Sequence, residues 1–202
     1  MNNKPKGYFE KLLILDCETS GLMNGDNSAI NYKTGEYCQA LSMGLIIVNS
    51  TSLAKIDELY VEIQWDGKSQ WHDRAQQVHG LTKQYLKEHG VPRYEAIELI
   101  GNFLLNYFGP DTAITVAAHN PHFDVDFLRE LMESEGIVLK FSHRKIDTNS
   151  IGFAIFNTYT SDQLFELIGI TRDPKNHNAL DDARGVLKVL QTVKTLSTKL
   201  IG

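Results

Sequence analysis

Blocks of apolar residues predict several β-strands in this chain. The apolar run at residues 11–15 ends directly in Asp16, which is typical of a buried central strand. β-branched and aromatic residues at 40–49 and 53–65, on either side of a Ser/Thr turn, predict a hairpin. Together these segments predict a three-stranded start to the fold.

A helical period takes over in the middle of the chain. Residues 71–108 are predicted to be helical, because their apolar positions recur three and four residues apart; the clearest set is Ala96, Ile97, Ile100, Phe103, Leu104 and Tyr107. A buried strand is predicted at 112–118, followed by a helix at about 122–135 that Gly136 ends. Strands and helices therefore alternate, as in an α/β protein.

The last third of the chain continues this alternation. A short strand is predicted around 145–146, and the helices that follow it begin after Asp147-Thr148, after Ser161-Asp162 and at about Ala179, the last one running to about Thr198. Residues 21–37, rich in Gly, Asn and Asp, predict a long loop instead. No repeat or linker divides the 202 residues, so we expect a single domain over 1–202 with its core at about 11–198.

Composition narrows the class of protein. No run of about 18 apolar residues is present, and the first apolar stretch is too short for a signal peptide, so we expect a soluble, cytoplasmic protein with no membrane contact. Cys17 and Cys38 lie in no CxxC pair and are expected to be reduced and buried. The net charge of −5 argues against a protein that neutralises many phosphates of a long duplex. Binding to only the end of a nucleic-acid strand agrees better with this charge.

Three short polar segments carry the candidate chemistry, and the first follows the predicted strand at 11–15. Asp16 and Glu18 are two residues apart, so in an extended strand their carboxylates point to one face while Cys17 points into the core. The alternative is that these acids are solvated turn residues, which are common where a strand ends. Thr19, Ser20 and the glycine after them favour the functional interpretation, because small residues let the backbone approach a nucleotide closely.

The second and third segments supply the remaining candidates. Asp124 lies in the first turn of the helix predicted after the strand at 112–118, where it could act in a functional site. The alternative is structural: Asn120 caps this helix, and the charge of Asp124 only complements the helix dipole. His177 and Asp182 are five residues apart, too far to share one face of a continuous helix. If the last helix opens at Asn178 or Ala179, Asp182 lies in its early turns and His177 on the preceding loop, where it is a candidate general base.

Four carboxylates gathered at one point would repel each other unless a cation neutralised them. Hard, oxygen-seeking cations such as Mg²⁺ or Mn²⁺ are the natural partners of such a cluster. Asp16, Glu18, Asp124 and Asp182 are therefore predicted metal ligands, with phosphate chemistry as the use of the metal.

At this point the chain resembles a known family, the DnaQ-like, DEDDh-type 3′–5′ exonucleases of the ribonuclease H-like superfamily. Its three segments match the DxExTG, HNxxFD and HxAxxD motifs in order, with Ser20 as a conservative departure, and residues 78–82 resemble the family's HG(I/L)T segment. The resemblance implies an α/β, ribonuclease H-like fold with a central mixed five-stranded sheet flanked by helices. It also implies that the four acids hold two Mg²⁺ or Mn²⁺ ions and that His177 activates the attacking water.

Motif position further suggests which residues contact substrate. Thr19, Ser20 and Leu22 are expected around the last sugar, and His79 and Phe123 around the base. The basic stretch 140–145 is predicted to steer the strand, with a solvated protein edge as the alternative.

The expected activity is release of nucleoside 5′-monophosphates from the 3′ end of single-stranded nucleic acid, with DNA somewhat favoured. An RNA-trimming exoribonuclease shares the same motifs and stays open as an alternative, as does a catalytically silent module that binds nucleic-acid ends. A polymerase or replication partner is also expected. The loop at 21–37 is longer than in a minimal member of the family, and the sequence does not predict how it affects access of the substrate to the site.

Overall fold

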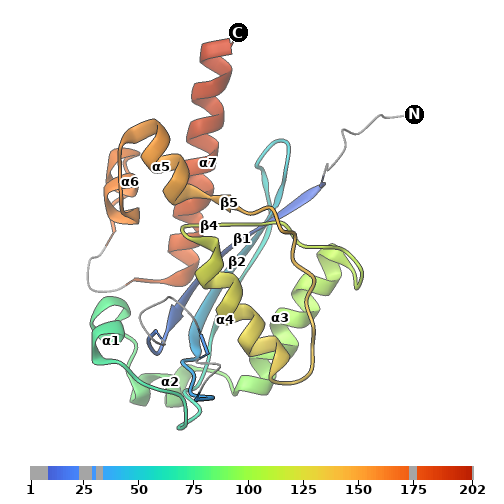
Figure 1. Cartoon of the computed structure of the whole chain (residues 1–202), viewed down its shortest axis with the longest axis vertical. Coiled ribbons are helices and arrows are strands. Elements are labelled where there is room, and N and C mark those ends of the chain that lie inside the picture. The colour runs from blue at the N-terminus through green and yellow to red at the C-terminus, as the bar shows by residue number, and fades with distance from the viewer. Residues whose placement is uncertain (1–8, 23–28, 31–33, 173–176, 202) are drawn as a thin grey trace.

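A computed structural model describes residues 9–22, 29–30, 34–172 and 177–201. Its centre is one sheet in the order β3-β2-β1-β4-β5 (Figure 1). The strands are β1 (Lys11–Thr19), β2 (Ala40–Asn49), β3 (Lys55–Glu62), β4 (Val116–Ala118) and β5 (Ile146–Asp147). β1, β2 and β3 pair antiparallel, whereas β1, β4 and β5 pair parallel. The predicted mixed five-stranded sheet is therefore confirmed.

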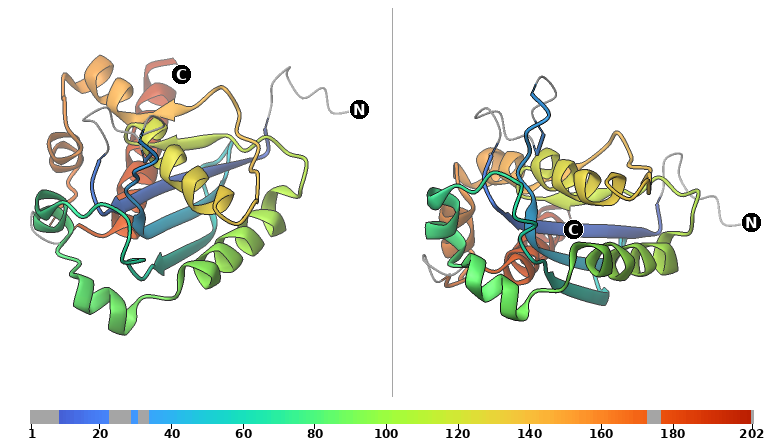
Figure 2. Two further views of the ribbon diagram at one scale, coloured as in Figure 1. Left: turned by 60° about the horizontal axis from the view of Figure 1, so that its bottom comes forward. Right: turned by 90° about the horizontal axis from the view of Figure 1, so that it is seen from below.

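Helices cover both faces of this sheet (Figures 1 and 2). Alternate residues of β1 point to opposite faces and are apolar on both, so each face packs into its own hydrophobic core. Leu13 and Leu15 pack with α3 (Arg93–Phe108) and α4 (Pro121–Glu133). Leu12 and Ile14 pack with the opposite layer, which consists of α5 (Thr148–Phe156), α6 (Ser161–Leu167) and α7 (Ala179–Ile201). The remaining helices, α1 (Asp73–His79) and α2 (Lys83–His89), lie between β3 and α3 in the chain. No helix in the described ranges is both long and apolar enough to cross a bilayer.

Close packing at Gly44 fixes where α7 begins relative to the sheet. A Cβ atom at this β2 residue would lie 2.4 Å from the backbone oxygen of Ala179 and 2.5 Å from the Cα of Leu180. Only a residue without a side chain lets the first turn of α7 approach the sheet this closely. The helix then runs past β1 and β2, and its C-terminal end extends away from the sheet (Figure 1).

The element boundaries differ from the predicted ones where pairing or packing decides them. β1 continues to Thr19 because β2 pairs with it as far as Ala40, so Asp16 and Glu18 lie within the strand instead of beyond its end. The predicted strand at 112–118 shortens to the three residues of β4, preceded by a single bridge between Ile114 and Phe141. The predicted loop at 21–37 falls in part outside the described residues; within the described part, Ile30 bridges Tyr37.

Candidate active site

Two acids project from the face of β1 that is covered by α7. Asp16 and Glu18 continue the side of the strand that carries Leu12 and Ile14, and Cys17 points into the opposite core, as the period of two predicts. Glu18 is 8% exposed and Asp16 is half-buried. Two carboxylates therefore lie side by side in a largely water-excluded position.

A third acid comes from the first turn of α4. Because β1 and β4 are parallel, the start of α4 lies next to the carboxyl-terminal half of β1. Asp124 is buried there, and its Oδ1 accepts a hydrogen bond of 3.1 Å from the backbone N–H of Cys17. Its Oδ2 is buried and has no hydrogen-bond partner among the described residues. Asn120 occupies the N-cap position of α4 in a left-handed conformation (φ 69°), as the capping alternative expects, but its side chain makes no capping hydrogen bond.

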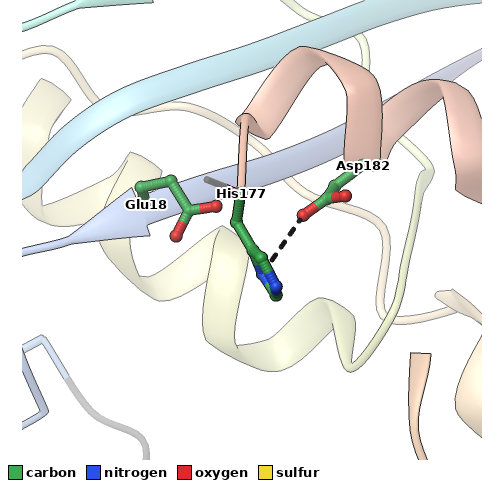
Figure 3. A group of neighbouring side chains, drawn as sticks. All are labelled: Glu18, His177 and Asp182. Atoms are coloured by element: carbon green, nitrogen blue, oxygen red, sulfur yellow. Dashed lines mark ion pairs between the residues drawn. The ribbon is translucent and has the colours of Figure 1, made fainter. Parts of the chain in front are cut away.

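The start of α7 brings a fourth acid and the histidine. The side-chain oxygen of Asn178 accepts hydrogen bonds from the backbone N–H groups of Leu180 and Asp181, so the helix opens where the sequence predicts. Asp182 is buried in the first turn, and His177 stands on the loop before it. The His177 Nδ1 lies 3.8 Å from the Asp182 Oδ2 (Figure 3). Asp181 points elsewhere, to an exposed ion pair of 2.8 Å with Arg184.

Burial and nearby negative charges raise the pKa of three of the acids, Asp16, Glu18 and Asp124. Burial raises the pKa of Glu18 to about 8, with Asp182 adding to the shift. Burial also raises the pKa of Asp124 to about 8. The pKa of Asp16 is raised well above its ordinary value by burial and by the charges of Asp124, Asp182 and Glu18. The four acids are therefore close enough to sense one another, and a cation among them would favour their charged forms.

The donor set fits a divalent metal. Glu18, His177 and Asp182 each offer one ligand atom, and these atoms lie within 4.8 Å of one another (Figure 3). The Asp124 Oδ2 is a buried carboxylate oxygen that lacks the partner such atoms normally have. Carboxylate oxygens are the preferred ligands of Mg²⁺ and Mn²⁺. The geometry thus brings together all five residues that the three sequence segments nominated.

A cavity of about 470 Å³ opens beside Glu18. Four of the residues predicted to contact substrate line it, namely Thr19, Leu22, His79 and Phe123. Ser20 does not: it is 1% exposed, and its hydroxyl accepts a hydrogen bond of 3.0 Å from the backbone N–H of Gln39. The prediction of a sugar contact at Ser20 gives way to a structural role, because this residue ties the end of β1 to the start of β2.

His79 lines the cavity with a ring whose nitrogens are both engaged. Its Nδ1 accepts the backbone N–H of Leu81 at 3.0 Å, so its Nε2 carries the hydrogen and donates to the carbonyl of Thr19 at 3.2 Å. Burial lowers the pKa of His79 to about 4, which keeps the ring neutral. His79 therefore shapes the wall next to Thr19 and has no ring nitrogen left over for a ligand.

Sequence reasoning missed other residues around the site. Arg172 contacts Asp182, and His72 packs so closely on Gly21 (φ 150°) that a Cβ there would lie 2.5 Å from the imidazole. Neither residue belongs to a motif, so no sequence signal identified it. In the basic stretch, Lys140 pairs with Asp111 at 2.8 Å on the surface, and the partly buried ring of Phe141 packs against the core, so Phe141 is not an open stacking surface.

The comparisons with known proteins agree with this geometry. The chain matches the family model RNase_T, described as exonuclease, over residues 13–190. A comparison with curated proteins finds no match. The nuclease domain of 3′hExo, a DEDDh family member bound to rAMP, is similar with a TM-score of 0.67 at 13% identity, covering 94% of each chain.

Two further solved structures share the fold. A 3′-exonuclease in specific recognition of the 3′ end of a histone mRNA stem-loop gives a TM-score of 0.64 at 14% identity, covering 93% of this chain and 83% of that one. E. coli exonuclease I in complex with a dT13 oligonucleotide gives 0.73 at 15% identity, covering 95% of this chain but only 42% of the other. Because the family model spans most of its length, the chain belongs to the RNase_T family of exonucleases, and it shares the fold of the DEDDh family member 3′hExo.

Proposed function

We propose that this chain is a two-metal-ion exonuclease that releases nucleoside 5′-monophosphates from the 3′ end of single-stranded nucleic acid, with DNA favoured over RNA. The observation that carries the proposal is the convergence of four acids and His177 beside a cavity able to receive one nucleotide. Neighbours in the comparison are described with dT13, rAMP or an mRNA stem-loop, which supports a nucleic-acid end as the ligand.

The four acids are the proposed ligands of two Mg²⁺ or Mn²⁺ ions. When bound, the metal ions would lower the pKa of a coordinated water and neutralise charge on the scissile phosphate. Asp16 and Glu18 from β1, Asp124 from α4 and Asp182 from α7 would supply the carboxylate oxygens that hold these ions, with Glu18 and Asp182 nearest to His177. Burial gives these carboxylates a low-dielectric setting in which such charge interactions are strong.

His177 is the proposed general base. It stands on the loop directly before α7, next to two of the proposed ligands, and it must be neutral to accept the proton of the attacking water. The backbone N–H of His177 donates to the carbonyl of Val78 at 3.4 Å, which links the imidazole to the wall of the nucleotide cavity. The general base and the proposed substrate cavity are thereby held in place relative to each other.

The cavity beside Glu18 is the proposed site of the 3′-terminal nucleoside. Leu22, Val78 and Phe123 offer apolar surface to a base and a sugar. The Thr19 hydroxyl already donates to the carbonyl of Gly21 at 3.1 Å, and both His79 ring nitrogens are engaged. Neither His79 nitrogen is therefore left to recognise a ribose 2′-hydroxyl, and among the side chains that line this cavity such recognition would fall to His72, Arg74 or the accepting side of the Thr19 hydroxyl.

Matched DNA and RNA strands of one sequence test the proposal. A 5′-labelled single strand should shorten stepwise in Mn²⁺ or Mg²⁺, and a 3′-labelled strand should release its label first as a nucleoside 5′-monophosphate. A chelator should stop both reactions, and circular single-stranded DNA should stay intact. Loss of the 5′ label first, or cutting of the circle, would refute the assigned polarity, and RNA cleaved faster than DNA would refute the preference.

A further inference from the structure

Arg172 places a positive charge inside the acid cluster. Its Nε donates to the Asp182 Oδ1 at 2.6 Å and its Nη2 donates to the Oδ2 of the same carboxylate. This is the two-pronged arrangement in which guanidinium and carboxylate bind most strongly. The Arg172 side chain is only 16% exposed, so solvent screens the pair weakly.

The same guanidinium has a second set of partners at the start of α6. Its Nη1 donates to the Ser161 hydroxyl at 2.9 Å and to the Asp162 carboxylate at 2.8 Å. Its central carbon lies 5.0 Å from the centre of the Phe165 ring, which is buried. Arg172 is thus held between two carboxylates, one buried in the acid cluster and one on the surface, where Asp162 is 69% exposed.

We propose that Arg172 is an intramolecular competitor of the metal ions, holding the Asp182 carboxylate in the metal-free protein and giving it up toward Asp162 when a divalent cation binds. This inference rests on the proposed function, because it takes Asp182 to be a metal ligand. The charge of Arg172 opposes the charges of Asp16 and Glu18 as well, so it also stabilises the metal-free cluster.

The physical reason is competition for the same oxygens. Both oxygens of Asp182 accept hydrogen bonds from Arg172, and one of them is within 3.8 Å of His177. A cation held by Glu18, His177 and Asp182 would lie close to the guanidinium, because either Asp182 oxygen that it could use already accepts a hydrogen bond from Arg172. A metal cation and a guanidinium that share one buried carboxylate repel each other strongly, so metal binding must loosen the Arg172–Asp182 pair.

Calorimetric titration of the full chain with Mn²⁺, without nucleic acid, tests this competition. At about pH 8.5, above the pKa of about 8 of both Glu18 and Asp124, Arg172→Gln should bind Mn²⁺ about tenfold more tightly than the wild type. In EDTA the same variant should unfold at a lower temperature, because the repelling acids lose their counter-charge. Arg184→Gln is the matched control, since Arg184 pairs with Asp181 and Glu58 at the surface, and it should leave Mn²⁺ affinity unchanged.

Asp162→Asn provides a test with the opposite sign. Without its surface partner Arg172 should hold Asp182 more firmly, so Mn²⁺ should bind about twofold to fivefold more weakly. In the Arg172→Gln background the Asp162→Asn effect should vanish, because no guanidinium is left to redistribute. A mere long-range charge effect would persist in that background and would overturn the mechanism.

The outcomes separate this inference from the proposed function. Arg172→Gln binding Mn²⁺ as the wild type does, or more weakly, overturns the competition. Asp182→Asn should lose Mn²⁺ affinity if Asp182 is a ligand. If Asp182→Asn instead binds Mn²⁺ like the wild type, the proposed ligand set itself fails, whatever the Arg172 variant does.

Discussion

Replacing Asp124 by Asn should stabilise the metal-free protein while removing its affinity for metal. The Asp124 Oδ1 accepts the backbone N–H of Cys17, and the amide oxygen of an Asn can keep that bond. The Oδ2 is buried with no described hydrogen-bond partner, and it lies among carboxylates. An amide NH₂ in its place could donate to a neighbouring acid, so a repulsive contact becomes an attractive one.

Two estimates of the same burial penalty bracket the magnitude. Giving a partner to a buried acceptor that has none is worth about 1–3 kcal/mol. The pKa of Asp124 is about 8 in the folded chain against an ordinary 3.8, so its stabilising contribution is complete only at low pH and is lost as the pH rises toward 8. At pH 7 that loss is about 4 kcal/mol as an upper bound, and an Asn avoids it. We therefore expect a gain of about 1–4 kcal/mol in EDTA.

Urea unfolding at about pH 7, followed by circular dichroism, measures this gain. Asp126→Asn is the control on the same helix: the Asp126 Oδ2 accepts the backbone N–H of Ala29 at 2.8 Å, a bond that an amide oxygen can also keep, so this variant should stay within about 1 kcal/mol of the wild type and should not gain stability. Added Mn²⁺ should stabilise the wild type but not Asp124→Asn. An Asp124→Asn protein less stable than the wild type in EDTA would refute the reasoning.

Further predictions concern pH, the histidine and the packing at α7. In EDTA the free energy of unfolding should fall as the pH rises from about 6.5 to 8, because Glu18 and Asp124 hold protons in the folded chain that they release on unfolding. The expected slope is about 1.4 kcal/mol per pH unit for each such proton, and a flat profile in that range would contradict the raised pKa values. His177→Ala should lower kcat by about 100-fold or more in saturating Mn²⁺, and undiminished single-turnover cleavage would reject the general-base assignment. Gly44→Ala should cost about 1–3 kcal/mol and weaken Mn²⁺ binding in calorimetry, because its Cβ would push Ala179 away, whereas Gly101→Ala, whose Cβ meets only the end of Met132 at 3.3 Å, should do neither.

The parts of the site that local chemistry decides were predictable from the sequence. The strand period placed Asp16 and Glu18 on one face and Cys17 on the other, and both placements are confirmed. The helix start at Asn178 and Ala179 separated His177 from Asp182 as expected. In each case a rule that spans only a few residues fixes where the side chain points.

The features that depend on partners distant in the sequence were not predictable. β1 runs past its apolar stretch because β2 supplies pairing as far as Thr19. Ser20 turns inward because Gln39 offers a backbone N–H at that point. Arg172 lies next to Asp182 only because α6 packs against α7, and a single arginine outside any motif gives no sequence signal of that contact.

The count of Mn²⁺ ions bound per chain, measured with the rate of single-turnover cleavage of a 3′-labelled strand, tests the central claim most directly. For the wild type we predict two ions and release of a labelled nucleoside 5′-monophosphate. For Asp16→Asn, which removes one of the four proposed metal ligands, we predict fewer ions and cleavage reduced to background, with folding retained in circular dichroism. Two bound ions together with undiminished cleavage in the Asp16→Asn protein would contradict the account.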